Sequence, residues 1–125
     1  MNEIHDFAAR YATAWCSGNP QRVAAFFTRN ATLTVNGGPP APALEIARAF
    51  MRDFPDLIVT CGKVERRGNQ TAFHWTLSGT HAGTGKHVLI RGYELWKIDD
   101  AGLIAESIGY FDATDYERQL RSTNE

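Results

Sequence analysis

The chain has 125 residues, 43% of them hydrophobic and 22% charged, which is the composition of an ordinary globular protein and the length of one domain, residues 1–125. Thirteen basic residues against fourteen acidic ones leave a net charge of −1, so we expect neither nucleic acid nor an anionic membrane as a partner. The sequence starts without a basic segment followed by an apolar run, and no stretch approaches the ~20 apolar residues of a membrane span, so a cytoplasmic location is expected.

Helical periodicity dominates the first half of the chain. Apolar residues recur at helical spacing in three segments, and the turn-forming residues between them separate the helices. Asn19 is placed to cap the second helix, and Pro55 stops the third. The alternating segment 31–35 predicts a strand between these two helices. The predicted helices span residues 4–15, about 20–27 and about 43–54.

The second half of the chain predicts an antiparallel sheet. Four segments with the pattern of strands follow Pro55 and are joined by short polar or glycine-rich turns. Consecutive strands joined in this way form a meander, and helices gathered before a sheet indicate an α+β fold. A short helix from about Asp115 closes the chain. The predicted strands span residues 57–65, 71–80, 87–98 and 103–111.

Five motifs stand out along these elements: YATAW at 11–15, FFTRNAT at 26–32, FPDL at 54–57, WTLSGTHAG at 75–83 and RGYELWKID at 91–99. Together they resemble the nuclear transport factor 2-like (ketosteroid isomerase-like) superfamily, and in particular its SnoaL-like polyketide cyclase branch. The resemblance covers nearly the whole chain. It implies a cone-shaped α+β barrel, in which a strongly curved antiparallel sheet wraps around the N-terminal helices and the open end of the cone is a ligand pocket.

The resemblance also implies positions for catalytic acids, and this chain lacks the acids there. Relatives of several activities carry acidic residues where this sequence has Val35, Thr76 and Gly109. Gly109 lies in the segment ESIGYFD, residues 106–112. Asp112 does not simply replace the missing acid, because it differs from Gly109 in strand parity and should face the other side of the sheet.

A different set of polar residues remains as the candidate site. The resemblance places His74 and Glu94 on the pocket side of neighbouring strands, where a Glu beside a His in an apolar cavity can act as an acid/base pair. Tyr11 falls where ketosteroid isomerases place the tyrosine that donates to a developing oxyanion. We therefore predict Glu94 as the base, His74 as its orienting partner or proton carrier, and Tyr11 as the oxyanion donor. The predicted ligand contacts are Trp15, Val35, Thr76, Trp96, Ser107 and Gly109.

Three functions fit these residues. The first is a cofactor-independent enzyme that cyclises or isomerises a small apolar carbonyl compound by proton transfer. The second is a non-catalytic ligand-binding or dimerisation module, which the missing acids favour; a buried Glu–His pair is as easily a structural couple. The third is a hydrolase or dehydratase that uses water activated by Glu94.

The remaining expectations concern partners. Two cysteines are too few for a disulfide framework, and no two histidines have the helical spacing of a zinc site, so we expect no metal and no cofactor. The apolar strand face with Phe73, Trp75 and Leu77 predicts that the outer side of the sheet packs against a second copy. A homodimer is therefore expected.

Overall fold

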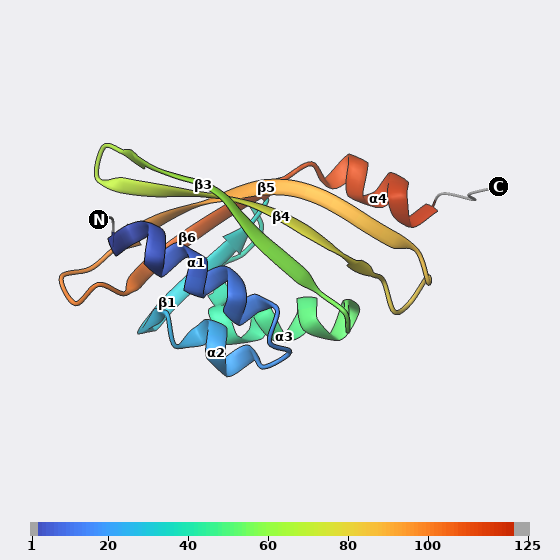
Figure 1. Ribbon diagram of the computed structural model, residues 1–125, viewed down its shortest axis with the longest axis horizontal. Coiled ribbons are helices and arrows are strands. Elements are labelled where there is room, and N and C mark those ends of the chain that lie inside the picture. Colours follow the sequence, from blue (N-terminus) through green and yellow to red (C-terminus); the bar gives the residue numbers. More distant parts are fainter. Residues whose placement is uncertain (1–2, 122–125) are drawn as a thin grey trace.

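The computed structural model describes residues 3–121 and confirms the α+β fold (Figure 1). The helices are α1 (Glu3–Trp15), α2 (Pro20–Ala24), α3 (Ala43–Asp53) and α4 (Ala113–Arg121). The strands are β1 (Phe27–Val35), β2 (Ala41–Pro42), β3 (Ile58–Arg67), β4 (Gln70–Thr80), β5 (His87–Ile98) and β6 (Ile104–Phe111). No helix within the described residues has the length and apolar character needed to cross a bilayer.

All six strands belong to one curved sheet, in the order β2-β1-β6-β5-β4-β3. β3 to β6 form the predicted antiparallel meander, and β1 joins β6 in parallel. The edge strands β2 and β3 do not pair with each other, so the sheet is an open, curved cone rather than a closed barrel. Figure 1 shows α1, α2 and α3 together on one side of this sheet, with α4 apart from them beside β5.

The second helix is shorter than its sequence pattern predicts, and β1 is longer. Asn19 caps α2 as expected, since its Oδ1 accepts from the backbone N–H of Gln21 at 3.0 Å. The helix nevertheless ends at Ala24, and Phe27 begins β1 by pairing with Ile104. Pairing with a distant strand therefore outweighs the local helical pattern at this position.

Aromatic packing fixes α1 against the sheet. The ring of Tyr11 meets the rings of Phe73 and Trp96 edge to face, with centroids 5.3 and 5.1 Å away, and those two rings stack on each other at 5.0 Å. All three side chains are fully buried. This packing holds the hydroxyl group of Tyr11, on α1, over the middle of β5.

The register of β4 against β5 reverses the predicted faces of β4. Phe73 lies opposite Glu94, and His74 lies opposite Tyr93. Residues directly opposite each other in a ladder share a face, so Phe73, Trp75 and Leu77 face the helices, while the residues between them face outward. The prediction that these three side chains form the outer face is therefore wrong, and so is the placement of His74 and Thr76 in the pocket.

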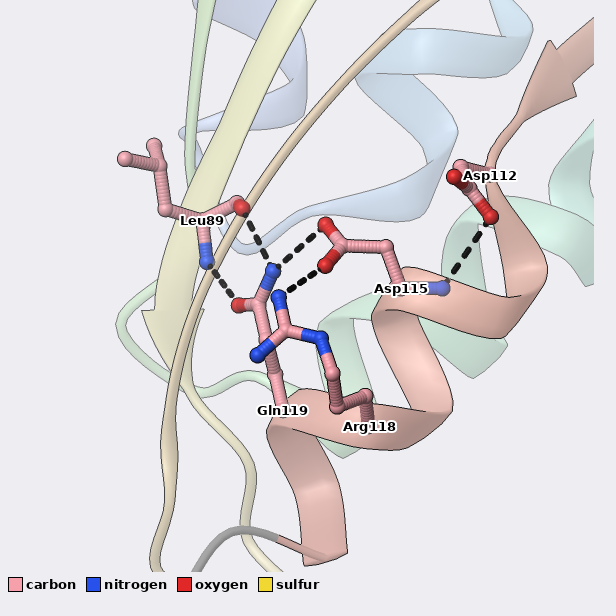
Figure 2. Close-up of polar contacts among 5 residues, drawn as sticks. All are labelled: Leu89, Asp112, Asp115, Arg118 and Gln119. Carbon is pink, nitrogen blue, oxygen red and sulfur yellow. Dashed lines mark hydrogen bonds and ion pairs between the residues drawn. The ribbon is translucent and has the colours of Figure 1, made fainter. Parts of the chain in front are cut away.

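Helix α4 is capped at its start by Asp112 and is hydrogen-bonded to β5 through Gln119 near its end (Figure 2). Asp112 accepts from the backbone N–H of Asp115 at 3.0 Å and so caps the helix, which explains why α4 begins two residues earlier than predicted. Further along, the side-chain amide of Gln119 accepts from the N–H of Leu89 at 2.8 Å and donates to its carbonyl at 2.9 Å. Asp112 is thus a helix cap and contributes no acid to the cone.

Candidate active site

A cavity of about 50 Å³ lies between the helices and the inner face of the sheet. Its lining is apolar apart from one carboxyl group, that of Glu94. The buried lining residues form the floor: Trp15, Leu33, Val59, Phe73, Leu77, Glu94 and Gly109. The half-buried lining residues form the mouth: Val35, Ile46, Phe50, Trp75 and Phe111. The one ionisable group among the described residues of the lining, Glu94, therefore belongs to its buried part.

Three hydrogen-bond donors converge on a single oxygen of Glu94. Tyr11 Oη donates to Glu94 Oε1 at 2.9 Å, Trp96 Nε1 donates to the same atom at 2.8 Å, and Ser107 Oγ donates to it at 2.8 Å. The donors come from α1, β5 and β6, and all three are fully buried. This arrangement holds the carboxyl group in one orientation.

The second oxygen, Oε2, receives no hydrogen bond from the described residues. Among those same residues, no buried side-chain nitrogen or oxygen is left without a partner, so Oε2 must retain accessible surface. Glu94 is only 7% exposed, and it lines the cavity. Oε2 is therefore the atom that Glu94 presents to whatever enters.

Burial raises the pKa of Glu94 above its usual value, and the hydrogen bonds from Trp96, Ser107 and Tyr11 hold that rise back. Burial, and then the nearby charge of Glu94, also raise the pKa of Tyr11 well above its usual value, so the tyrosine keeps its proton. Because Oε1 already accepts three hydrogen bonds, Oε2 is the atom at which Glu94 gains or loses a proton. The group can accept a proton from the cavity or donate one to it.

His74 does not meet Glu94. It lies on the outer face, with its Nε2 at 3.0 Å from Glu65 Oε2. Glu65 also accepts from Arg67 Nη2 at 2.9 Å and lies 3.6 Å from the ammonium of Lys63. The hydrogen bonds from Arg67 and then His74 lower the pKa of Glu65 to about 2. The histidine therefore belongs to an outward-facing polar cluster with Glu65, Arg67 and Lys63.

The other predicted site residues fall into three groups. Trp15, Val35 and Gly109 line the cavity together with Glu94. Trp96, Ser107 and Tyr11 lie behind the carboxyl group as its donors and contribute nothing to the lining. Thr76 faces outward, opposite Thr60 on one side and Arg91 on the other. In the structure, Tyr11 is thus a positioning residue for Glu94, since its hydroxyl donates a hydrogen bond to that carboxylate and keeps its proton.

Sequence patterns missed much of the cavity wall. Leu33 on β1 and Ile46 and Phe50 on α3 lie on apolar stripes that look like ordinary core. The predicted faces of β4 put Trp75 on the outer side of the sheet. In the structure Trp75 lies on the inner side, where its ring centroid is 6.2 Å from that of Phe111 at the mouth of the cavity. If the residues on either side of the turn at 82–85 are paired one by one, residue 73 falls opposite residue 94. This pairing puts Trp75 on the same face as Glu94 and would have identified it as part of the cavity wall.

No group of three or more His, Cys, Asp or Glu side chains between residues 3 and 121 is arranged to hold a metal ion. The arrangement present is one carboxyl group with a free oxygen in an apolar cavity, behind which three neutral donors are fixed. Such a group can exchange a proton with a bound molecule.

Several solved structures share this fold. A hypothetical protein from Catenulispora acidiphila with a ketosteroid isomerase-like fold, solved in complex with trimethylamine, has a TM-score of 0.81 and 16% identity over 91% of each chain. IdmH from Streptomyces antibioticus, a proposed polyketide cyclase, has a TM-score of 0.78 and 21% identity over 97% of this chain and 100% of its own. A proposed SnoaL-like polyketide cyclase from Jannaschia sp. CCS1 has a TM-score of 0.77 and 17% identity over 98% and 92%.

These identities are low, and the superpositions establish the fold alone. A search of curated protein sequences finds no significant match. The family model of the SnoaL-like domain, in contrast, matches residues 8–107, which is most of the chain. The match confirms the resemblance seen in the sequence motifs: the protein belongs to the SnoaL-like domain family.

Proposed function

We propose that this protein is an enzyme that catalyses proton transfer, without a cofactor, on a small apolar carbonyl compound, with Glu94 as the general acid/base. One observation carries the proposal: Glu94, the only ionisable group in the lining as far as residues 3–121 form it, has one oxygen fixed by three donors and the other presented to the cavity. A buried carboxyl group with a raised pKa can serve as base and then as acid. The apolar walls suit an apolar substrate.

The proposed reaction begins when Oε2 of Glu94 removes a proton from a carbon next to a carbonyl group, which leaves an enolate. In an isomerisation, the same proton returns to another carbon of the conjugated system. In a cyclisation, the enolate carbon attacks a second carbonyl carbon of the same molecule, and Glu94 protonates the new alkoxide. Either course restores Glu94 and needs no oxidant, reductant or second substrate.

Cyclisation is the course that we favour. IdmH and the Jannaschia protein, which share the fold, are proposed polyketide cyclases. Because the proton of Tyr11 is committed to Glu94, a substrate oxygen needs a different donor. Among the side chains of the lining, the indole N–H groups of Trp15 and Trp75 are the donors by residue type, since the other neutral side chains carry none.

The test uses deuterium exchange, because it requires only the first step. Cyclohexanone and a set of small apolar ketones are incubated with the protein in D2O, and loss of the proton next to the carbonyl group is followed by proton NMR. We expect exchange above the buffer rate with wild type and a fall of about 100-fold or more with Glu94→Gln. His74→Asn is the matched control on the outer face and should keep the wild-type rate.

A non-catalytic ligand-binding module is the second candidate. The absence of an acid at Val35 and Gly109, which line the cavity, favours it, because Glu94 is then the only acidic group among the described residues of the lining. If no ketone of the set exchanges faster than in buffer while ligands still bind, the binding module is the better description.

We also propose that the chain forms a homodimer through the outer face of the sheet, in the cytoplasm. Of the large apolar side chains that the structure describes, three are exposed, namely Ile58 at 53%, Leu89 at 47% and Tyr110 at 39%. The ladder places all three on the outer face, since Ile58 and Leu89 both flank Ser78, and Tyr110 lies opposite Tyr93. Exposed apolar side chains that gather on one face are typical of an interface.

A further inference from the structure

Two glycines lie on the inner face of neighbouring strands, and the structure requires only one of them. Gly92 on β5 lies beneath the indole of Trp75. A Cβ atom at this position would collide with that indole and with the backbone carbonyl of Tyr110. Packing therefore demands glycine at residue 92.

Gly109 on β6 is different. Its φ lies outside the left-handed region, so its backbone conformation is open to any residue. A Cβ atom here would meet Glu94 Cγ at 3.5 Å, the carbonyl of Thr34 at 3.6 Å and that of Tyr93 at 3.8 Å, which are ordinary contacts. Glycine within a strand also costs stability relative to alanine. Neither conformation nor packing explains the missing side chain.

The place of Gly109 supplies a reason. It lies directly opposite Glu94 in the ladder and lines the floor of the cavity. Its backbone is also held firmly: the N–H of Asn36 donates to the carbonyl of Gly109 at 2.8 Å, and Asn36 Oδ1 accepts from the N–H of Phe111 at 2.9 Å. The space that a side chain would fill beside Glu94 is therefore kept open by a fixed strand.

We propose that Gly109 is a specificity-determining residue, whose missing side chain leaves room for the reacting group of the substrate beside Oε2 of Glu94. This inference rests on the proposed function only in naming the ligand a substrate, since the space itself is a matter of binding. A methyl group at position 109 occupies the flank of the carboxyl group without disturbing the three donors behind it. Ligands that reach Glu94 should then bind less well, while the fold remains intact.

The experiment measures binding of phenol, whose hydroxyl can donate to Oε2, and of toluene, which has the same shape and no donor. Dissociation constants come from NMR titration of the full chain. The variants are Gly109→Ala and Glu94→Gln. Gly62→Ala, on β3 outside the cavity lining, is the matched control, because a Cβ atom there also makes only an ordinary contact, with the carbonyl of His74 at 3.6 Å.

We expect Gly109→Ala to weaken phenol binding by about tenfold or more and to leave Tm unchanged or raised by up to about 5 °C. Gly62→Ala should bind phenol as wild type does. Glu94→Gln should bind phenol more weakly than wild type does, because the side-chain NH2 that takes the place of Oε2 cannot accept the hydrogen bond from its hydroxyl. Wild-type affinity of Gly109→Ala for phenol would overturn the proposal, and so would a large fall in its Tm, because the glycine would then be required by the fold.

Failure of the proposed function looks different. If Gly109→Ala loses phenol as expected but wild type exchanges no ketone proton, the binding role of Gly109 stands and catalysis does not. If wild type exchanges the proton and Gly109→Ala binds phenol normally, only the inference about Gly109 fails.

Discussion

Glu94 is the residue in which burial and chemistry conflict most strongly. Three neutral donors surround Oε1, and none of the lining residues within 3–121 is basic, so none of them compensates a negative charge. Burial therefore dominates and raises the pKa of the carboxyl group. The burial that favours proton exchange by Glu94 therefore also makes its ionised form destabilise the folded protein.

The conflict predicts how Glu94→Gln changes stability with pH. At low pH, Glu94 is protonated in the folded and unfolded chain and contributes no pH dependence. As the pH rises past the value at which the unfolded chain loses this proton, the folded chain still holds it, so stability falls until the raised folded pKa is passed. Each pKa unit by which folding raises the pKa of Glu94 lowers the free energy of unfolding at high pH by ~1.4 kcal/mol.

Glutamine keeps the acceptor for the three donors and cannot ionise. We therefore expect Glu94→Gln to have a Tm close to that of wild type at acidic pH and a higher Tm at neutral pH. Thermal unfolding followed by circular dichroism across this range gives the comparison. A variant less stable than wild type at neutral pH would mean that the three hydrogen bonds to the charged carboxylate outweigh its burial.

At the scale of elements, α4 protects an otherwise open part of the sheet. β5 is paired with β4 along its first residues, but β6 joins it only from Gly92 onward. The amide of Gln119 takes the place of a neighbouring strand at Leu89, and its nitrogen also donates to Asp115 at 2.9 Å (Figure 2). One side chain thereby satisfies a free edge of β5 and holds the helix.

Gln119→Ala should remove the contact of α4 with Leu89 and the contact of this side chain with Asp115. We expect a loss of about 1 kcal/mol in the free energy of unfolding, because the three hydrogen bonds of Gln119 lie at the surface, where each contributes less than the ~1 kcal/mol of a typical buried hydrogen bond. Urea unfolding measures this loss, and faster hydrogen exchange at the amide of Leu89 locates it. Glu117→Ala, on the exposed side of α4, is the control and should change neither quantity. Unchanged protection at Leu89 in Gln119→Ala would contradict this role.

At the scale of the molecule, the two faces of the sheet have separate tasks. The inner face packs on α1 and α3 and forms the cavity, while the outer face carries a row of rings: His74, Tyr93 and Tyr110, with neighbouring centroids 5.8 and 5.3 Å apart. The guanidinium of Arg67 lies 5.8 Å from the centroid of Tyr93. Tyr110 of this row and, further along the same face, Ile58 and Leu89 are the exposed apolar side chains that support the proposed dimer.

A charge at Leu89 should therefore weaken self-association. We expect Leu89→Lys to raise the dimer dissociation constant by about tenfold or more, because a buried interface does not tolerate an unpaired ammonium. Sedimentation velocity over a range of concentrations measures the change. Thr13→Lys, on the exposed surface of α1, is the control and should behave as wild type. A wild-type chain that stays monomeric at all concentrations would remove the dimer proposal itself.

Much of this protein follows from local sequence patterns. Helical and alternating periodicity place most helices and strands, because those patterns reflect which side of one element is buried. The motifs around Trp15, Trp75 and Trp96 identify the family. Glu94 is singled out by the absence of an acid at three other positions. Even the register of β4 against β5 is implied by the symmetric turn at 82–85, although alternation alone does not say which face is inner.

Only the tertiary structure decides the site itself. Tyr11 reaches Glu94 across 83 residues of sequence, because aromatic packing fixes α1 on the sheet, and no local pattern encodes that contact. The parallel pairing of β1 with β6 likewise joins two segments that are far apart in the sequence and brings Val35 beside Gly109. The sequence predicts His74 in the pocket, whereas the structure has it on the outer face. An error of one residue in the register of β4 is enough to cause this difference, because neighbouring side chains of a strand point to opposite faces. Periodicity records whether a side chain is buried, whereas the partner against which it is buried depends on contacts between distant segments.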